Sequence, residues 1–227
     1  MQLSIALPCY NEEENIEQTI ADVSAWFDTA GVEGEIVAVD DGSTDGTRET
    51  LTRLTTQLPE LRLVVHEQNL GYGAAVRSGL DTGTMDWLAF MDSDGQFRVS
   101  DFDKLIPYAR EAEVITGRRF KRADPLVRRL NAKGFGLLNR VFFGVSVHDI
   151  NCAMKMIRRE RWPEIRPSVT GGAVFNLELF ARVKKHEVEW RQVFVNHYPR
   201  SAGTQTGANP RVILRALREM LVLRWKL

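Results

Sequence analysis

The chain of 227 residues is long enough to bury one substantial hydrophobic core. Its 30 Lys and Arg residues balance its 30 Asp and Glu residues, and its two cysteines, Cys9 and Cys152, exclude a disulfide framework. No apolar run approaches the roughly 18 residues of a membrane-spanning helix, and residues 1–8 lack the features of a secretory signal peptide. We therefore expect a cytoplasmic protein, and any contact with the cytoplasmic face of a membrane must be peripheral.

The neutral total hides an uneven distribution of charge along the chain. Residues 1–116 contain 7 Lys and Arg against 22 Asp and Glu, whereas residues 117–227 contain 23 against 8. Such a division indicates different tasks for the two halves, with a polyanion or an anionic membrane surface on the basic side. Neutralisation of one half by the other across an interface explains the division as well, and the sequence leaves both interpretations open.

The first half alternates short apolar runs with segments of helical periodicity. We expect strands at 3–7, 36–39, 61–65, 87–91 and 114–116. We expect helices at 12–27, 44–58, 71–82 and 100–112. The first strand should end at Pro8. The short connections between these elements predict an α/β fold with a parallel sheet covered by helices.

The second half is less regular and more basic. Its expected elements are an amphipathic basic segment at 125–143, a strand at 151–157, a helix at 176–186, a strand at 188–195, a Gly/Thr-rich loop at 201–209 and a helix at 210–225. The sequence contains no repeat and no long linker. We therefore expect a single domain over 1–227, with 1–116 as its nucleotide and metal half and 117–227 as its acceptor half.

Two acidic clusters lie where two of the expected strands end. Asp40 and Asp41 follow the second strand, and Asp92 and Asp94 follow the fourth. Open α/β sheets bind ligands beyond the carboxyl ends of their strands. Carboxylates gathered there repel one another unless a cation lies between them, and an Asp-x-Asp pair suits Mg²⁺ or Mn²⁺ shared with a diphosphate. The clusters predict a metal-dependent enzyme acting on a phosphate-bearing substrate.

Two further segments lie at the same expected edge of the sheet. Residues 8–12 follow the first strand, and a turn in which Asn11 starts the helix explains them equally well. Residues 69–75 enter a helix through Gly71 and Gly73, whose backbone N–H groups could face a phosphate. Tight packing of that helix on the sheet is an equal explanation. An Asx-turn accounts for Asp45, although it does not account for the adjacent pair before it.

The segments 8–12, 40–47, 69–75 and 92–96 together resemble the family-2 glycosyltransferases with a GT-A fold. Within that family the chain looks most like the dolichyl- or polyprenyl-phosphate mannose synthase group. Four later segments also resemble motifs of that group. Gly117–Phe120 is similar to its Gly-Ser-Arg-Tyr, and residues 128–134 are similar to its basic segment. Residues 149–155 are similar to its Asp-x-x-Ser-Gly-Phe-Arg, and Arg200–Gly203 matches its Arg-x-x-Gly. The chain departs from the pattern at Lys133, where arginine is usual, within 149–155, and at Gln205 and Thr206, which replace Ser-Lys.

The resemblance implies a Rossmann-like, mostly parallel sheet flanked by helices, and it implies roles for single residues. Asp40 and Asp41 would hold the nucleoside of a sugar nucleotide. The other residues expected at the nucleotide are Pro8, Tyr10, Asn11, Glu12, Gly71, Asp92, Ser93 and Arg200. Asp92, Asp94 and Gln96 would hold Mg²⁺ or Mn²⁺ on the diphosphate. The implied catalytic set is Asp94, Arg119, Lys133 and Asp149.

The implied reaction is transfer of a hexose, with inversion, from GDP-mannose or a UDP-sugar to a polyprenyl or dolichyl phosphate. An ionised lipid phosphate needs no strong general base, and Arg119 and Lys133 would orient it. The alternative acceptor is the hydroxyl of a soluble sugar or small molecule, which does need a base. Asp149 is the candidate base, or it merely organises its loop.

Other interpretations of the chain are less well supported. A nucleotidyltransferase should carry a Gly-rich basic loop after the first strand, where residues 8–12 have none, and a binding protein with a dead site should lack Asp92 or Asp94. No nucleic-acid-binding module is recognisable, and His148 and His197 are expected to be structural. The oligomeric state stays open.

The last expected helix has two stripes of side chains. Its basic stripe holds Arg211, Arg215 and Arg218, and its apolar stripe holds Leu214, Leu217, Leu221 and Trp225. Such a helix either rests on an anionic membrane surface or packs its apolar stripe on the sheet. Residues 126–145 are a second candidate for the membrane surface.

Overall fold

The computed structural model describes residues 1–120, 134, 136, 138–170, 172, 174–199 and 210–226, without the side chains of residues 210–215 and 217. Its strands are β1 (Gln2–Cys9), β2 (Glu33–Asp41), β3 (Leu61–His66), β4 (Trp87–Met91), β5 (Val114–Arg119), β6 (Met154–Arg158) and β7 (Trp190–Val195). Its helices are α1 (Ile16–Ala30), α2 (Thr47–Thr55), α3 (Tyr72–Thr82), α4 (Phe102–Leu105), α6 (Trp162–Ile165), α7 (Phe175–Lys185) and α8 (Pro210–Lys226), with 3-10 helices η1 (Val99–Asp101), η2 (Ile106–Arg110) and η3 (Arg159–Arg161).

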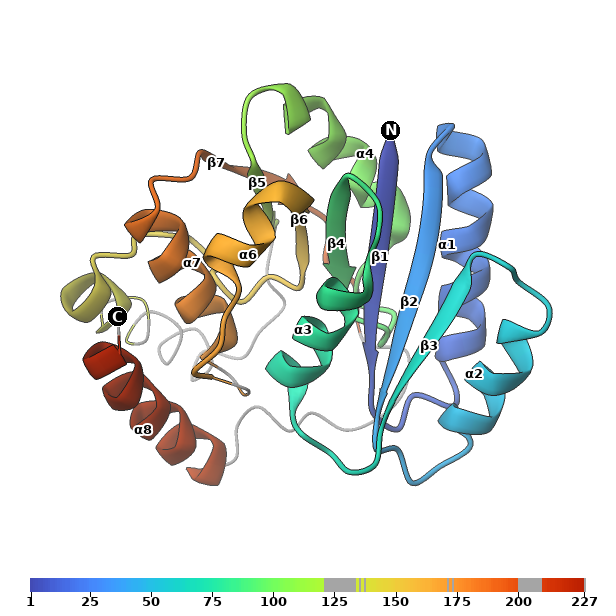
Figure 1. The fold of residues 1–227 in the computed structure, drawn as a ribbon, viewed down its shortest axis with the longest axis horizontal. Helices are drawn as coiled ribbons and strands as arrows, with labels where there is room; N and C mark the ends of the chain where they lie inside the picture. The colour runs from blue at the N-terminus through green and yellow to red at the C-terminus, as the bar shows by residue number, and fades with distance from the viewer. Residues whose placement is uncertain are drawn as a thin grey trace.

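The strands form one mixed sheet in the order β3-β2-β1-β4-β6-β5-β7 (Figure 1). The pairs β1–β2, β1–β4, β2–β3 and β5–β7 are parallel, whereas β6 runs antiparallel to both β4 and β5. The expected mostly parallel sheet flanked by helices is confirmed. The antiparallel β6 places its first residues beside the carboxyl ends of β4 and β5, which brings the second half of the chain to the candidate site.

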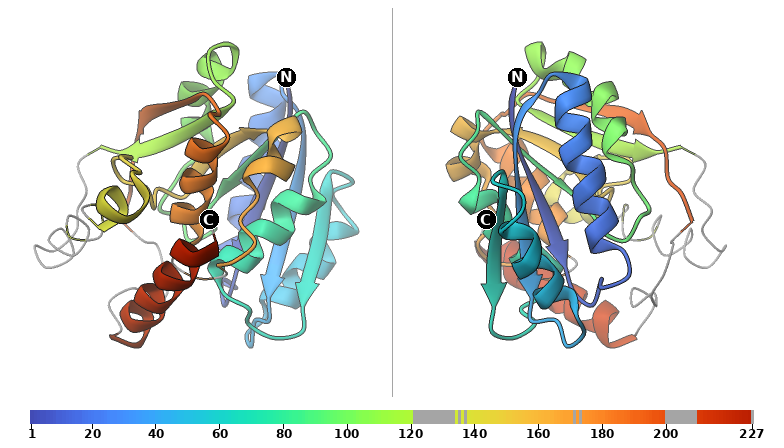
Figure 2. Two further views of the ribbon diagram at one scale, coloured as in Figure 1. Left: turned by 60° about the vertical axis from the view of Figure 1, so that its left-hand side comes forward. Right: turned by 90° about the vertical axis from the view of Figure 1, so that its right-hand side faces the viewer.

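Helices cover both faces of the sheet (Figure 2). One hydrophobic cluster joins α1, α2 and α4 to side chains such as Ile5 and Ile36, and the other joins α3, α6, α7 and α8 to the opposite face through Ala6 and Phe90. All five residues of β4 are buried, as a strand between two helical layers requires. No helix in the described part of the chain has the length and apolar character to span a bilayer.

Two expected boundaries are wrong for identifiable reasons. β1 continues through Pro8 to Cys9, because β4 pairs only with Leu3–Ala6 and Pro8 lies beyond the part of β1 that is paired on both sides. The helix expected at 100–112 is broken into η1, α4 and η2, because Pro107 lacks the N–H group that a continuous helix needs. Most of the basic segment at 125–143 and the whole loop at 201–209 lie outside the described residues, and 138–143 are helical.

Ion pairs between the described residues join the acidic and basic halves. They include Asp81–Arg166 at 2.5 Å, Glu113–Arg161 at 2.8 Å and Glu111–Arg191 at 3.8 Å. The side chains in these pairs are between a quarter and three fifths exposed, so each pair contributes little to stability. Neutralisation between the halves is therefore real among the described residues.

A buried carboxylate fixes the loop before α7. Glu178 is 0% exposed and accepts hydrogen bonds from the N–H groups of Ser168 at 2.7 Å and Thr170 at 2.8 Å, and from Arg182 Nε at 2.9 Å. Burial by itself raises the pKa of Glu178, but these hydrogen bonds outweigh burial and hold the pKa below its usual value of 4.5. The carboxylate form therefore stabilises the fold.

We predict that Glu178→Gln lowers the free energy of unfolding at pH 7 by about 3 kcal/mol, because it sets an amide N–H₂ group against backbone donors. The stabilisation is fully present above the unfolded pKa and is lost as pH falls through the lower folded pKa. Urea unfolding from pH 7 to pH 3 should therefore show that the difference in free energy of unfolding between wild type and Glu178→Gln becomes smaller below about pH 4.5. The exposed Glu164→Gln is the control, and a gap that does not depend on pH would contradict this account.

Candidate functional site

The candidate site lies at the carboxyl ends of β1, β2 and β4, at the lower edge of the sheet in Figure 1. Asp40 and Asp41 are the last two residues of β2, so they belong to the strand and do not follow it. Both are buried, with 0% and 3% exposure. Two adjacent carboxylates at such depth need partners, because burial of an uncompensated charge is costly.

The protein supplies partners for both carboxylates of this pair. Asp40 accepts hydrogen bonds from Ser43 N–H at 3.0 Å and from Arg48 Nε at 2.7 Å. Asp41 accepts from the backbone N–H groups of Leu70 and Gly71, each at 2.9 Å. His66 Nδ1 lies 2.7 Å from Asp41 Oδ1, and its Nε2 lies 2.9 Å from Ser78 Oγ. Asp41 therefore ties the loop before α3 to the end of β2, and the nucleoside role of both residues stays a prediction.

Gly42 lets two loops of the site approach each other closely. Its φ is +69°, and a Cβ there would lie 2.5 Å from the backbone carbon of Gln68. Gly71 has a φ of +98° at the start of α3. Gly73 has a packing role, since its Cβ would lie 2.6 Å from Phe175 Cβ. Gly73 therefore serves packing, against α7 and not against the sheet, whereas the Gly71 N–H already donates to Asp41 and a phosphate contact of this segment stays a prediction.

Residues 10–12 are tied to the loop after β2. Asn11 has a φ of +56°, its N–H donates to Ser43 Oγ at 3.1 Å, and its Oδ1 accepts from Thr44 N–H at 2.8 Å. Asn11 does not start α1, which begins at Ile16. Glu12 is buried, and Tyr10 is 46% exposed at the rim.

Asp92 and Asp94 follow β4 at the same edge, with Ser93 buried between them. Ser93 Oγ donates to the carbonyl of Pro8 at 2.8 Å, which links the ends of β4 and β1. Asp94 Oδ1 accepts from Gln96 N–H at 3.0 Å. Tyr198 N–H, after β7, donates to the Gln96 carbonyl at 3.0 Å. The Asp-x-Asp turn is therefore held from two sides.

The electrostatics of this carboxylate pair favour a cation. Burial, followed by repulsion from Asp94, raises the pKa of Asp92 from 3.8 to about 7. The groups that oppose the rise are Tyr72, Arg119 and Lys155. Carboxylates under this repulsion are ligands that Mg²⁺ and Mn²⁺ prefer. Within the described ranges no three His, Cys, Asp or Glu side chains form a metal site, so a cation would complete its shell with Gln96, substrate oxygens or water.

Arg119 and Asp149 form a buried ion pair at the end of β5. Asp149 accepts from the Arg119 backbone N–H at 3.0 Å, from Nε at 2.8 Å and from the terminal nitrogen at 2.5 Å. The two side chains are only 11% and 7% exposed. Both oxygens of Asp149 are therefore engaged, which is how an organising residue behaves. Its role as a general base stays a prediction.

The remaining candidates fall in two groups. Lys133 and Arg200 lie outside the described residues. The two histidines near the site make structural contacts: His197 packs edge-on against Phe97 at 5.4 Å, and the carbonyl of His148 accepts from Gln192.

The structure adds four residues that the sequence interpretation missed. They are Arg48, His66, Tyr72 and Lys155. Tyr72, in the first turn of α3, interacts with Asp92, and burial together with this carboxylate raises the pKa of the Tyr72 phenol. Lys155 left a signal in the sequence, because it is a lone charge within the apolar run 153–157.

Replacing Gly42 by Ala should push apart the loop after β2 and the loop that contains Gln68 and should lower the free energy of unfolding. The added methyl group meets the Gln68 backbone, and the positive φ adds about 1–2 kcal/mol of strain. Gly31→Ala is a matched control, because Gly31 has a similar φ of +62° and open space around its Cβ position. Urea unfolding should show a larger loss for Gly42→Ala, and calorimetry should show weaker binding of UDP or GDP for Gly42→Ala alone. Equal effects of the two variants would contradict the close approach.

Comparison with known proteins places the chain in a family. Residues 4–166, from β1 to α6, match the family described as Glycosyl transferase family 2. The chain is 31% identical over 160 residues to an undecaprenyl-phosphate 4-deoxy-4-formamido-L-arabinose transferase of Pectobacterium carotovorum, covering 69% of this chain and 49% of the relative. It is 30% identical over 162 residues to a dodecaprenyl-phosphate galacturonate synthase of Rhizobium johnstonii, covering 70% and 48%. The matches thus span about half the length of these two relatives.

The fold has counterparts among solved structures. One is glucosyl-3-phosphoglycerate synthase of Mycobacterium tuberculosis, solved in complex with Mn²⁺, UDP and glucosyl-3-phosphoglycerate. The TM-score is 0.73 at 18% identity, and the match covers 99% of this chain and 80% of the other. This likeness shows the GT-A fold. The family match and the two relatives show that the chain belongs to glycosyl transferase family 2.

Proposed function

We propose that the protein is a metal-dependent, inverting glycosyltransferase that moves a hexose from GDP-mannose or a UDP-sugar to a polyprenyl phosphate. The observation that carries this proposal is the pairing of two charge environments at one sheet edge. The Asp92–Asp94 pair needs a cation, and Arg119 is held beside it by Asp149. A nucleotide diphosphate with its metal suits the first environment, and an acceptor phosphate suits the second.

The donor side follows from the described contacts. Asp92, Asp94 and Gln96 would hold Mg²⁺ or Mn²⁺, which when bound supplies positive charge to the leaving diphosphate. The side-chain nitrogen of Gln96 faces the Tyr198 carbonyl at 3.4 Å, so its oxygen is the atom to reach a cation. The expected nucleotide contacts of Tyr10, Asn11 and Glu12 lie on the loop beside Asp40 and Asp41, and Arg200 is proposed from the sequence alone.

The acceptor follows from the state of Asp149. A hydroxyl acceptor needs a base to remove its proton, whereas a phosphate is already ionised at neutral pH. Asp149, the candidate base, uses both oxygens to hold Arg119. This arrangement favours a phosphate acceptor oriented by Arg119, with Lys133 in the same role. The two relatives are named as an undecaprenyl-phosphate transferase and a dodecaprenyl-phosphate synthase, which supports the same acceptor class.

A face of α8 supports peripheral contact with a membrane. Met220 and Leu223 pack into the core, whereas Leu221 is 61% exposed and Trp225 is 90% exposed. Of the expected apolar stripe, Leu221 and Trp225 point to solvent, and the side chains of Leu214 and Leu217 lie outside the described residues. Exposed basic residues on the same helix are Arg218, Arg224 and Lys226. An exposed apolar stripe flanked by cations suits an anionic lipid surface.

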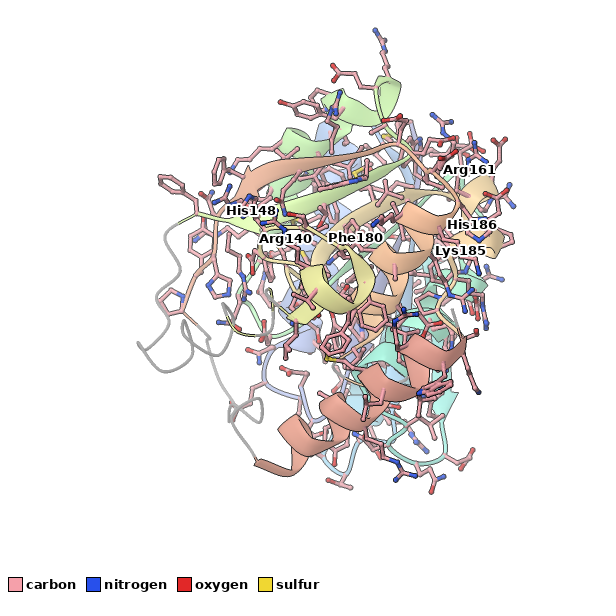
Figure 3. All side chains as sticks on the ribbon, turned by 90° about the vertical axis from the view of Figure 1, so that its left-hand side faces the viewer. Arg140, His148, Arg161, Phe180, Lys185 and His186 are labelled. Atoms are coloured by element: carbon pink, nitrogen blue, oxygen red, sulfur yellow. The ribbon has the colours of Figure 1, made fainter. Side chains whose placement is uncertain are left out.

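The helical residues 138–143 carry a second set of exposed apolar and basic side chains. Val141 is 69% exposed, Phe142 is 46% exposed, and Arg140 is exposed beside them. Figure 3 looks onto the side of the molecule where this segment and α8 both lie in front. A polyprenyl phosphate keeps its chain in the bilayer, so an enzyme that takes it as acceptor benefits from such a surface.

The decisive assay offers radiolabelled GDP-mannose, UDP-glucose and UDP-GlcNAc with Mn²⁺, with and without a short polyprenyl phosphate. We expect label to enter the organic phase in one of these reactions.

Asp94→Ala should reduce turnover at least about 100-fold and abolish metal-dependent donor binding, because it removes a ligand of the cation. Asp86→Ala, at the opposite end of β4, is the matched control. A fully active Asp94→Ala enzyme would exclude the metal site, and metal-dependent donor hydrolysis without lipid product would indicate a soluble acceptor.

Vesicle sedimentation tests the membrane face directly. Trp225→Ala should weaken binding to vesicles that contain anionic lipid by about tenfold, because an exposed indole no longer enters the interface. Tyr108→Ala is the control, since Tyr108 is 36% exposed on the remote η2. Binding that is unchanged by Trp225→Ala, or equally weakened by both variants, would contradict the assignment.

A further inference from the structure

Lys155 is a fully buried lysine next to the candidate site. It is 0% exposed and lies on the central part of the sheet, where its register partners are Phe90 on β4 and Thr116 on β5. Asp92 follows Phe90 by two residues, and Arg119 follows Thr116 by three. The antiparallel direction of β6 therefore brings a basic residue of the second half between the strands that carry the carboxylate pair and the arginine.

The ammonium group of Lys155 is held in one position. Its Nζ donates to the carbonyl of Ile150 at 3.1 Å and to the carbonyl of Cys152 at 2.5 Å. The same nitrogen lies 5.2 Å from the ring centre of Phe90 and 5.9 Å from that of Phe180. Carbonyl oxygens and aromatic faces both attract a cation, so these contacts compensate part of the cost of burial.

The two carbonyls belong to the turn that holds Arg119. Cys152 N–H donates to the Asp149 carbonyl at 2.9 Å, which closes the turn. Asp149 has a φ of +51°, in the left-handed region that Asp adopts more readily than most residues with a side chain and that suits a turn. Its carboxylate then receives the backbone N–H and the guanidinium of Arg119. Lys155 is thus the buried end of a short chain of contacts that leads to the arginine.

Filling the space between the aromatic rings does not by itself account for a lysine here. An apolar side chain of similar length would fill the space between Phe90 and Phe180 without the desolvation of a charge, and such replacements are often neutral or stabilising. It would, however, leave the carbonyls of Ile150 and Cys152 without their donor. The special contribution of Lys155 is therefore to the geometry of the turn.

We propose that Lys155 is a positioning residue: its ammonium group locks the Asp149–Cys152 turn and thereby holds the Arg119 guanidinium at the phosphate position beside Asp92 and Asp94. This inference rests on the proposed function for the role of Arg119. It concerns orientation and needs no proton transfer by Lys155. Loss of the ammonium group should misplace Arg119 while the carboxylate pair and the nucleotide loops keep their structure.

Two readouts test the proposal, and the first is independent of catalysis. Lys155→Met removes the donors and keeps the length of the side chain, and Lys155→Arg restores a cation with several N–H donors. Hydrogen exchange should become faster at the amides of Arg119 and Cys152 in Lys155→Met, stay near wild type in Lys155→Arg, and stay unchanged at Val37 in β2. If Lys155→Met is unfolded by circular dichroism, Lys155→Gln takes its place. Wild-type exchange rates at both amides would overturn the proposal whether or not the protein transfers sugar to a lipid.

The second readout is a double-mutant cycle on transfer to polyprenyl phosphate. Lys155→Met should lower kcat/KM for the acceptor about 10- to 100-fold, as loss of an outer-shell partner does, with nearly unchanged affinity for the donor nucleotide. Lys155→Arg should retain most of the activity. The double mutant with Lys155→Met and Arg119→Lys should lose no more kcat/KM for the acceptor than Arg119→Lys alone, because Lys155 acts through Arg119.

The outcomes separate this inference from the proposed function. Two results would overturn the positioning role: a loss of kcat/KM in the double mutant that equals the product of the two single losses, or a Lys155→Met enzyme with wild-type kcat/KM. Neither result would affect the proposed glycosyl transfer itself. A wild-type protein that transfers no sugar to any polyprenyl phosphate would overturn the proposed acceptor. Hydrogen exchange would then still decide whether Lys155 locks the turn.

Discussion

Repulsion between carboxylates at one edge of the sheet is the constraint on which the rest of the site depends. Parallel strands that end together bring their acidic residues together, and each must find a compensating group. Asp40 uses Arg48, Asp41 uses His66 and two backbone amides, and Asp149 uses Arg119. The pair Asp92 and Asp94 is different, because repulsion between its members still raises the pKa of Asp92. Tyr72, Arg119 and Lys155 offset this repulsion only in part, and the pair is therefore the candidate place for the cation of the proposed function.

The antiparallel β6 explains how the two differently charged halves of the chain meet. A parallel strand in its position would begin at the opposite edge, far from the carboxylates. Because β6 runs the other way, the turn before it carries Asp149 to the carboxyl edge, and Lys155 follows at the depth of Phe90. The acidic half thus contributes Asp92 and Asp94, and the basic half contributes Arg119 and Lys155. The surface ion pairs between the halves are a lesser consequence of the same division.

The sequence could predict which strand ends meet, but not how their charges are compensated. Uninterrupted apolar runs specify the strands of the first half, and the acidic residues after them mark the edge. The insertion of β6 between β4 and β5 depends on pairing between distant segments, which periodicity does not encode. For the same reason the contact of Arg48 with Asp40 could not be foreseen, and the lone charge of Lys155 marked that residue without indicating its partners. The family resemblance supplied candidate site residues, whose roles stay predictions, and it did not indicate that Asp40 and Asp41 already accept hydrogen bonds within the protein.

The proposed reaction brings two anions together, and the arrangement of charge suits that problem. A nucleotide diphosphate and an acceptor phosphate repel each other, so their approach needs positive charge on both sides of the reacting carbon. The Asp92–Asp94 pair would recruit one cation as a metal, and the turn held by Lys155 would fix a second as Arg119. A neutral hydroxyl acceptor would make no use of the second cation and would need a base instead. The engagement of Asp149 with Arg119 therefore favours a phosphate over a hydroxyl as the attacking group.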